Sequence, residues 1–226
     1  MIITYTFDLF QRNINPNKVI VMLKLISFNL LIITFVLISC SKSEEADEKT
    51  ASTIYANSKS GDTASGSITV GSDTLTGTYK GLCASTSTMS SYPSDATHVG
   101  FVIVITGSSS YTKEMNYYTD SACTSLSLGW YFNFDNVTVG DASGSDYKIT
   151  ANQASHDILA NTSGGETFIE SLFSNQLDVT VGTEKTTNDG TLYYNLINIS
   201  GTTLNYGDES SSAYPSSSSD ITFKQQ

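Results

Sequence analysis

The chain has 226 residues, which allows one domain or at most two small ones. It carries 22 acidic against 11 basic side chains, a formal net charge of −11. A surface of this sign repels nucleic-acid phosphates and anionic lipid headgroups, so binding to nucleic acid and charge-driven attachment to a membrane are both disfavoured. Ser, Thr, Gly, Asn and Tyr dominate the polar part of the chain, which favours strands over helices.

The first apolar stretch covers residues 25–38 and follows Lys24. This is the length of the hydrophobic region of a signal peptide and is short for a membrane span. The stretch ends in Leu37-Ile38-Ser39-Cys40, and the polar run SKSEE follows at once. This junction resembles the lipobox of bacterial lipoproteins. The resemblance implies cleavage before Cys40, diacylglycerol on its thiol and a further acyl chain, such as palmitate, on the new amino terminus.

The alternatives for this stretch are a buried strand or a transmembrane helix. Fourteen residues behind a lysine are too long for a typical strand, and a spanning helix would not stop at a cysteine followed by charge. Two or three acyl chains hold a protein stably to a membrane. Because Ser rather than Asp follows Cys40, resemblance to the sorting rule of diderm bacteria implies an outer-membrane lipoprotein of the cell envelope, facing the periplasm or the surface.

These observations divide the chain into three parts. Residues 1–39 are expected to be a signal peptide, and translation starting at Met22 would remove an n-region of unusual length. Residues 40–65 hold the lipidated cysteine and a polar, flexible tether without an apolar face. Residues 66–226 form a β domain.

The clearest strand of this domain is residues 126–134. Leu126, Leu128, Trp130, Phe132 and Phe134 alternate with Ser, Gly, Tyr, Asn and Asp, as expected for a half-buried antiparallel strand. After Asp135-Asn136 the apolar positions change parity, which indicates a bulge or a turn.

The same pattern predicts further strands in chain order. They are residues 74–83, 99–106 (buried on both faces), 111–118, 147–150, 177–181, 192–199, 202–206 and 221–223, with Asn188-Asp189-Gly190 as a turn. One short helix is expected after a capping box, Ser163 to Glu166, with Phe168, Ile169, Leu172 and Phe173 on one face. The fold class is all-β: an antiparallel barrel of about eight strands, or a β-sandwich, with one short helix.

Two cysteines remain after lipidation of Cys40. An even pair outside the cytoplasm indicates a disulfide between Cys83 and Cys123, and two separate buried thiols are the alternative. Neither cysteine has a basic neighbour that would activate it as a nucleophile.

Residues with catalytic potential are few. His98 is expected to open a strand, and His156-Asp157 to lie in a loop or a helix cap. Neither histidine has the spacing of a metal site. We therefore predict no enzyme activity, no metal and no cofactor.

Two segments, TGTYKGLC with YYTDSAC and ISGTTLNYGDES with its closing strand, carry a second resemblance. They resemble bacterial lipocalin-like lipoproteins, including relatives of the extracellular domain of the adenomatosis polyposis coli down-regulated protein. The resemblance implies an up-and-down β-barrel, a Cys83–Cys123 disulfide and an apolar small-molecule ligand.

Two functions fit these expectations. In the first, the barrel interior binds an apolar ligand or lipid, or is simply filled by the same side chains as a core. The candidate lining residues are Tyr79, Tyr111, Met115, Tyr117, Trp130, Phe132 and Phe134. In the second, an envelope scaffold binds other macromolecules, whose identity the sequence does not indicate, through outward-facing Tyr118, Tyr131 and Tyr193.

Overall fold

The structure is a computed structural model that describes residues 57, 64–218 and 221–226. The chain divides into two units, residues 1–49 and 50–226. The predicted signal peptide and Cys40 lie outside the described residues. In the part that is described, no helix has both the length and the apolar character needed to cross a membrane.

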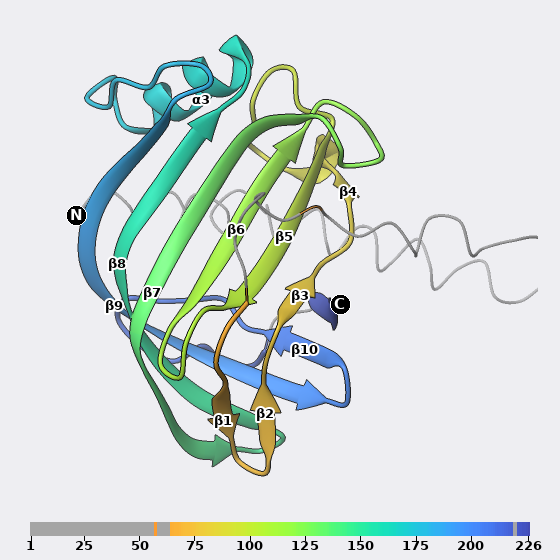
Figure 1. Cartoon of the computed structure of the whole chain (residues 1–226), viewed down its shortest axis with the longest axis vertical. Coiled ribbons are helices and arrows are strands. Elements are labelled where there is room, and N and C mark those ends of the chain that lie inside the picture. The colour runs from red at the N-terminus through yellow and green to blue at the C-terminus, as the bar shows by residue number, and fades with distance from the viewer. Residues whose placement is uncertain (1–56, 58–63, 219–220) are drawn as a thin grey trace, which may run out of the picture. The chain divides into compact units, whose positions relative to one another are not determined.

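The second unit is built from strands (Figure 1). Their bounds are β1 (Ile68–Val70), β2 (Asp73–Leu75), β3 (Thr78–Lys80), β4 (Ala84–Ser85), β5 (His98–Ile105), β6 (Tyr111–Tyr118), β7 (Leu126–Ser143), β8 (Asp146–Ala160), β9 (Glu184–Ser200), β10 (Thr203–Tyr206) and β11 (Thr222–Gln225). A 3₁₀ turn, η1 (Thr86–Thr88), and one helix, α3 (Ser163–Leu172), complete the described elements.

Eight antiparallel strands close into a barrel. Around the ring the order is β3, β11, β10, β9, β8, β7, β6 and β5. Closure comes from the pairing of β5 with β3, which places Tyr79 opposite Ile103. The prediction of an antiparallel barrel with one helix is therefore confirmed, and the sandwich alternative is wrong. Closure leaves fewer exposed sheet edges that could pair with other chains.

The strands bury different faces to different extents. In β5, Ile103 and Ile105 belong to the barrel core, whereas Val102 and Val104 pack in a second cluster with Tyr118. This confirms the prediction of a strand buried on both faces. Tyr118 also donates a hydrogen bond to the backbone carbonyl of Asn57, so part of the predicted tether contacts the outside of the barrel.

Three long strands, β7, β8 and β9, form one side of the barrel, and two predictions about them are wrong. The strand expected at 147–150 extends to Ala160, so His156 lies inside a strand rather than in a loop. Asn188-Asp189-Gly190 is a bulge within β9, not a turn, since Gln153 pairs with Thr191 and Ser155 with Asn188. The bulge predicted after Asp135 is present, with Asn136 at a φ of 50°.

Two other predicted strands also differ from the structure. Residues 74–83 divide into β2 and β3, because Gly77 turns the chain at a φ of +80°. No strand forms within residues 177–181. Leu177 and Val179 are nevertheless buried in the barrel core, so their apolar alternation reflects packing rather than strand pairing.

The two ends of the barrel are closed differently (Figure 1). The β1–β2 hairpin places Ile68 and Leu75 in the core at one end. At the other end α3 buries Ile169, and the apolar face predicted from the sequence is confirmed. The N-cap is Thr162, one residue before the Ser163 expected from the predicted capping box, and its side chain accepts the backbone N–H of Gly165.

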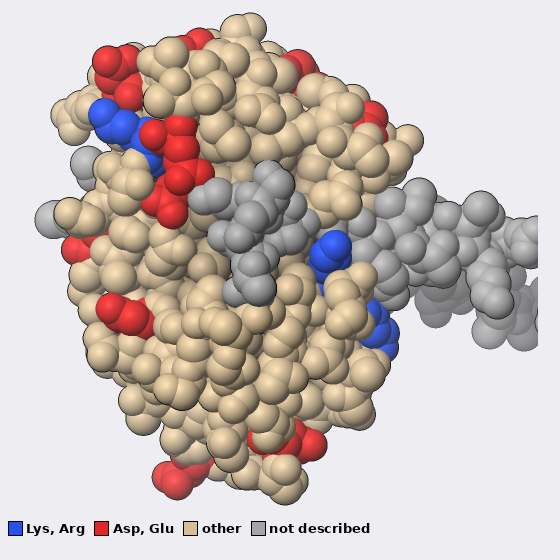
Figure 2. All heavy atoms as spheres, viewed as in Figure 1, with Lys and Arg blue, Asp and Glu red and all other residues tan. Residues whose placement is uncertain are grey.

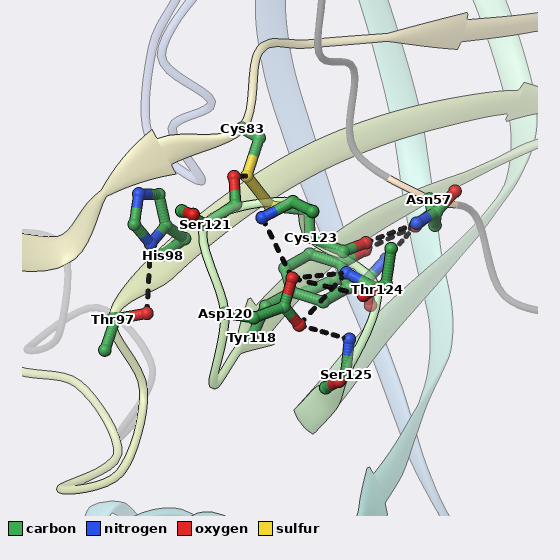
Figure 3. Close-up of a disulfide and its surroundings, with 12 residues drawn as sticks. Asn57, Cys83, Thr97, His98, Tyr118, Asp120, Ser121, Cys123, Thr124 and Ser125 are labelled. Atoms are coloured by element: carbon green, nitrogen blue, oxygen red, sulfur yellow. Dashed lines mark hydrogen bonds between the residues drawn. A yellow bond between two sulfur atoms is a disulfide. The ribbon is translucent and has the colours of Figure 1, made fainter.

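A disulfide joins Cys83, after β3, to Cys123 in the turn between β6 and β7, with the Cα atoms 5.9 Å apart (Figure 3). Cys123 is fully buried. The Asp120 carboxylate organises the same turn by accepting hydrogen bonds from Thr124 and Ser125 (Figure 3). These bonds outweigh the effect of desolvation and lower the pKa of Asp120 to about 2. The alternative of two separate thiols is wrong.

Charged side chains are sparse on the face shown in Figure 2, where the acidic ones occupy several separate places. A dispersed negative charge of this kind favours solubility and does not define a binding patch.

Candidate functional site: an ion pair inside the barrel

The seven predicted lining residues all belong to or pack against the barrel core. Six are buried and Met115 is partly buried; the buried ones are Tyr79, Tyr111, Tyr117, Trp130, Phe132 and Phe134. Strand register brings several of them together, since Tyr111 pairs with Phe134 and Met115 with Trp130. Their predicted orientation is therefore correct.

The aromatic rings largely fill the interior by packing on one another. Tyr111 stacks on Phe134 with ring centroids 4.7 Å apart, and Trp130 lies 4.9 Å from Phe132. Beside the β1–β2 hairpin there is a void of ≈ 10 Å³. Its lining includes Ile68, Leu75 and Tyr206. A volume of this size is comparable to that of a single water position and far below that of a drug-sized ligand.

A lysine lies among these rings. Lys113 pairs with Ile103 of β5 and Phe132 of β7, and because paired residues share a face of the sheet, its side chain points into the barrel. Its Nζ atom is 5.2 Å from the centre of the Phe132 ring and 5.9 Å from that of Phe134. The Tyr206 ring is 5.8 Å away on β10. These rings supply cation–π attraction to an ammonium group whose side chain is only 14% exposed.

The counter-ion of Lys113 is Glu209. Its Oε2 atom forms an ion pair with Lys113 Nζ, and its side chain is 6% exposed. The other oxygen, Oε1, accepts the hydroxyl hydrogen of Tyr206. Tyr206 and Tyr111 are themselves joined at 2.7 Å. Since the single hydrogen of Tyr206 goes to Glu209, Tyr111 must donate to Tyr206, and the two hydroxyls form a chain that ends on the carboxylate.

Glu209 comes from the loop after β10, not from a strand. Strand β10 pairs with β9 over residues 197–200, and the chain then leaves the barrel wall at Gly207, whose N–H donates to the Leu196 carbonyl at 2.8 Å. Ser210 next bridges to Tyr194 with two backbone hydrogen bonds of 2.8 and 3.1 Å. A side chain on Gly207 would lie 2.6 Å from the Asn195 amide oxygen, so this close approach requires glycine.

The surroundings keep the tyrosines protonated. Desolvation raises the pKa of Tyr111 and Tyr206 well above 10, and the charge of Glu209 raises both further. Tyr193 lies near the same groups; desolvation, Asp189 and Glu209 raise its pKa to about 12. All three hydroxyls are therefore protonated at physiological pH, and those of Tyr111 and Tyr206 donate hydrogen bonds.

Two buried nitrogen atoms of residues that belong to the barrel interior have no hydrogen-bond partner within the described part of the chain: Trp130 Nε1 and His156 Nδ1. His156 is 2% exposed and pairs with Phe132, so it faces the interior in the same row as Lys113. Its ring is 5.9 Å from that of Trp130. Desolvation lowers the pKa of His156, although Asp189 and Asp157 act in the opposite sense. An unpaired buried polar nitrogen costs about 1–3 kcal/mol, so two such nitrogen atoms in one core are unusual.

Sequence reasoning missed Lys113, Glu209 and the interior position of His156. Lys113 has the same parity as Tyr111 and Met115, so the alternation that identified those two residues also places Lys113 inside. Nothing in the local sequence identifies Glu209 as its partner, since the two are 96 residues apart.

The remaining predicted candidates do not form a site. His98 begins β5 as expected, and its Nδ1 atom lies 3.0 Å from the Thr97 hydroxyl. Among the described residues, no three His, Cys, Asp or Glu side chains are grouped so that they could hold a metal ion. Tyr118 and Tyr131 are 2% and 1% exposed, so they do not form the outward recognition surface expected from the sequence.

The fold and this site define a β-barrel with a charged group in an aromatic interior. A comparison with protein-family models finds no match. A comparison with curated proteins likewise finds none.

Proposed function

We propose that this chain is a lipoprotein of the bacterial cell envelope whose barrel binds an amphipathic small molecule in its interior. In this proposal, acyl chains on Cys40 tether the barrel to a membrane, most simply the outer membrane, and the barrel binds a ligand rather than catalysing a reaction. The junction Leu37 to Cys40 supports the location in the cell envelope, and the aromatic lining of the closed barrel supports the class of ligand.

One observation carries the binding proposal: the Lys113–Glu209 ion pair in the barrel interior. Replacing a buried ion pair by apolar residues is often neutral or stabilising, so stability alone is a weak reason for a barrel to contain one. A convergence of a few polar groups in an apolar, aromatic setting is typical of ligand sites. The unpaired nitrogens of Trp130 and His156 add two further polar groups to the same interior.

The binding proposal is tested with the reporter that the chain provides. Trp130 is the single tryptophan, and it lies in the barrel interior, so its fluorescence reports on that interior alone. Titration with sodium oleate should quench it in a saturable manner. Lipids extracted from the protein, purified from its own host, should contain a bound amphiphile in mass spectrometry. The proposal is refuted if oleate causes no quenching and mass spectrometry finds no bound molecule.

The attachment to a membrane through Cys40 is tested separately. Cells fed labelled palmitate should yield labelled protein in the membrane fraction, and a Cys40→Ala variant should be unlabelled and leave that fraction. A Cys40→Ala variant that stays in the membrane pellet would show that the anchor is not this thiol.

A second candidate function is an envelope scaffold that binds macromolecules through its outer face. The filled interior, with its void of ≈ 10 Å³, favours this candidate, because a pre-formed ligand cavity is many times larger. Fluorescence titration decides between the two, since a scaffold leaves Trp130 unaffected by oleate.

A further inference from the structure

The ion pair inside the barrel is assembled from two unequal parts. Lys113 lies in the middle of β6, whose residues pair on both sides with β5 and β7. Glu209 lies in the loop after β10, and the neighbouring contacts that hold this loop are the Gly207 and Ser210 backbone bonds and the Tyr206 hydroxyl. The cation is therefore part of the barrel wall, and the carboxylate can leave without breaking the strand pairing of the ring.

We propose that Glu209 stands in for the head group of the ligand: an amphiphile with a carboxylate head displaces the loop from Gly207 to Ser210 and pairs with Lys113 in its place. This inference deepens the proposed function and rests on it. It describes the filled interior as the ligand-free state, in which the chain's own carboxylate occupies the cation site.

The chemistry of the site favours a carboxylate over a neutral head. Removing Glu209 leaves the Lys113 ammonium group among three aromatic rings, and a buried charge that loses its partner is strongly destabilising. A ligand carboxylate restores the ion pair and accepts the Tyr206 hydrogen bond as Glu209 does. An alcohol head would leave the ammonium group without a counter-ion.

The remaining polar groups and rings fit the rest of such a ligand. The buried Nδ1 atom of His156 and Nε1 of Trp130 have no partner within the described residues, and either nitrogen, where it carries a hydrogen, could donate to a further oxygen of a ligand in the interior. Phe132 and Phe134, beside Lys113, offer apolar contact to an alkyl chain. The unpaired nitrogens thus supply an observation independent of the ion pair.

The test uses the full-length protein in detergent, titrated with sodium oleate and with oleyl alcohol, which differ only in the head group. Glu209→Gln removes the internal competitor, and we expect oleate to bind at least about tenfold more tightly than to wild type, because the binding-competent fraction rises. Asp208→Asn is the matched control: it removes the same charge from the adjacent, exposed position and should leave binding unchanged. Lys113→Gln should abolish the preference for oleate over the alcohol.

The outcomes separate the inference from the function on which it rests. No quenching of Trp130 by either probe in any variant refutes the proposed function itself. Quenching that is equal for oleate and oleyl alcohol, or equal for wild type and Glu209→Gln, refutes the inference and leaves interior binding intact. Gly207→Ala provides a second route if Glu209→Gln does not fold, since its Cβ atom would lie 2.6 Å from the Asn195 amide oxygen and would loosen the loop while leaving Lys113 and Tyr206 in place. It should tighten oleate binding several-fold, and no change would count against displacement of Glu209.

Discussion

Breaking the Cys83–Cys123 disulfide should destabilise the barrel by an amount that the structure allows one to calculate. The bond joins residues 40 positions apart, and in the chain-entropy model closing a loop of this length is worth about 4 kcal/mol at 25 °C. For a domain of this size, about 2–4 °C of melting temperature correspond to each kcal/mol. We therefore expect the reduced protein to melt about 8–16 °C lower than the oxidised protein.

The measurement is thermal unfolding followed by Trp130 fluorescence in a Cys40→Ser background, which removes the third cysteine. Reduction keeps both sulfur atoms, so it isolates the effect of the crosslink. A Cys83→Ala/Cys123→Ala variant also removes sulfur from a fully buried position in the cluster with Val102 and Tyr118, and should be somewhat less stable still. A loss of less than about 1 kcal/mol on reduction would refute the reasoning from loop closure.

Three further changes test the interior and the helix. Gly165→Ala should weaken the docking of α3, since the new Cβ atom would lie 2.5 Å from a backbone oxygen of β7; Gly140→Ala, with 3.6 Å of space, is the control in urea unfolding. Single replacement of Lys113 by Met or Glu209 by Leu should cost about 3–5 kcal/mol, whereas the double replacement should be close to neutral in the same assay. Stability should fall as the pH drops below about 6.5, because the unfolded chain takes up a proton that the desolvated His156 resists. His156→Phe should flatten that part of the profile, and an unchanged profile would contradict the assignment.

The sequence predicted those parts of the fold that depend on local periodicity. Residues 126–134 alternate over five pairs and form the first half of β7, and the parity change after Asp135 marks a real bulge. The same reasoning failed at Asn188-Asp189-Gly190, where turn-forming residues sit within β9. A bulge and a turn need the same positive φ, which Gly190 provides at +106°, and only pairing with β8 distinguishes them.

The sequence also underestimated the length of β8, for a related reason. The sequence predicts a strand over residues 147–150 only, and the segment that follows, Ala151 to Ser155, includes Ala and Asn, which have low strand propensity. In the barrel this strand pairs with β7 on one side and β9 on the other, and its Ile158 and Ala160 are fully buried. Tertiary pairing on both sides thus overrides the local preference. His156 was placed outside the core by this error.

The charged side chains inside the barrel could not be predicted from the sequence, and the physical reason is a different one. An alternating strand reads as apolar inside and polar outside, and a lysine at an inward position contradicts that reading unless its partner is known. The partner of Lys113 is supplied by the turn at Gly207 and the bridge from Ser210 to Tyr194, which depend on where β10 stops pairing with β9. The loop bridges to β9 beyond the end of β10 and, by the same geometry, brings a carboxylate to the lysine. If the loop served only to cover the part of β9 beyond the end of β10, apolar residues in place of Glu209 and Lys113 would serve equally well. The presence of the ion pair thus supports the proposed role of the interior in binding.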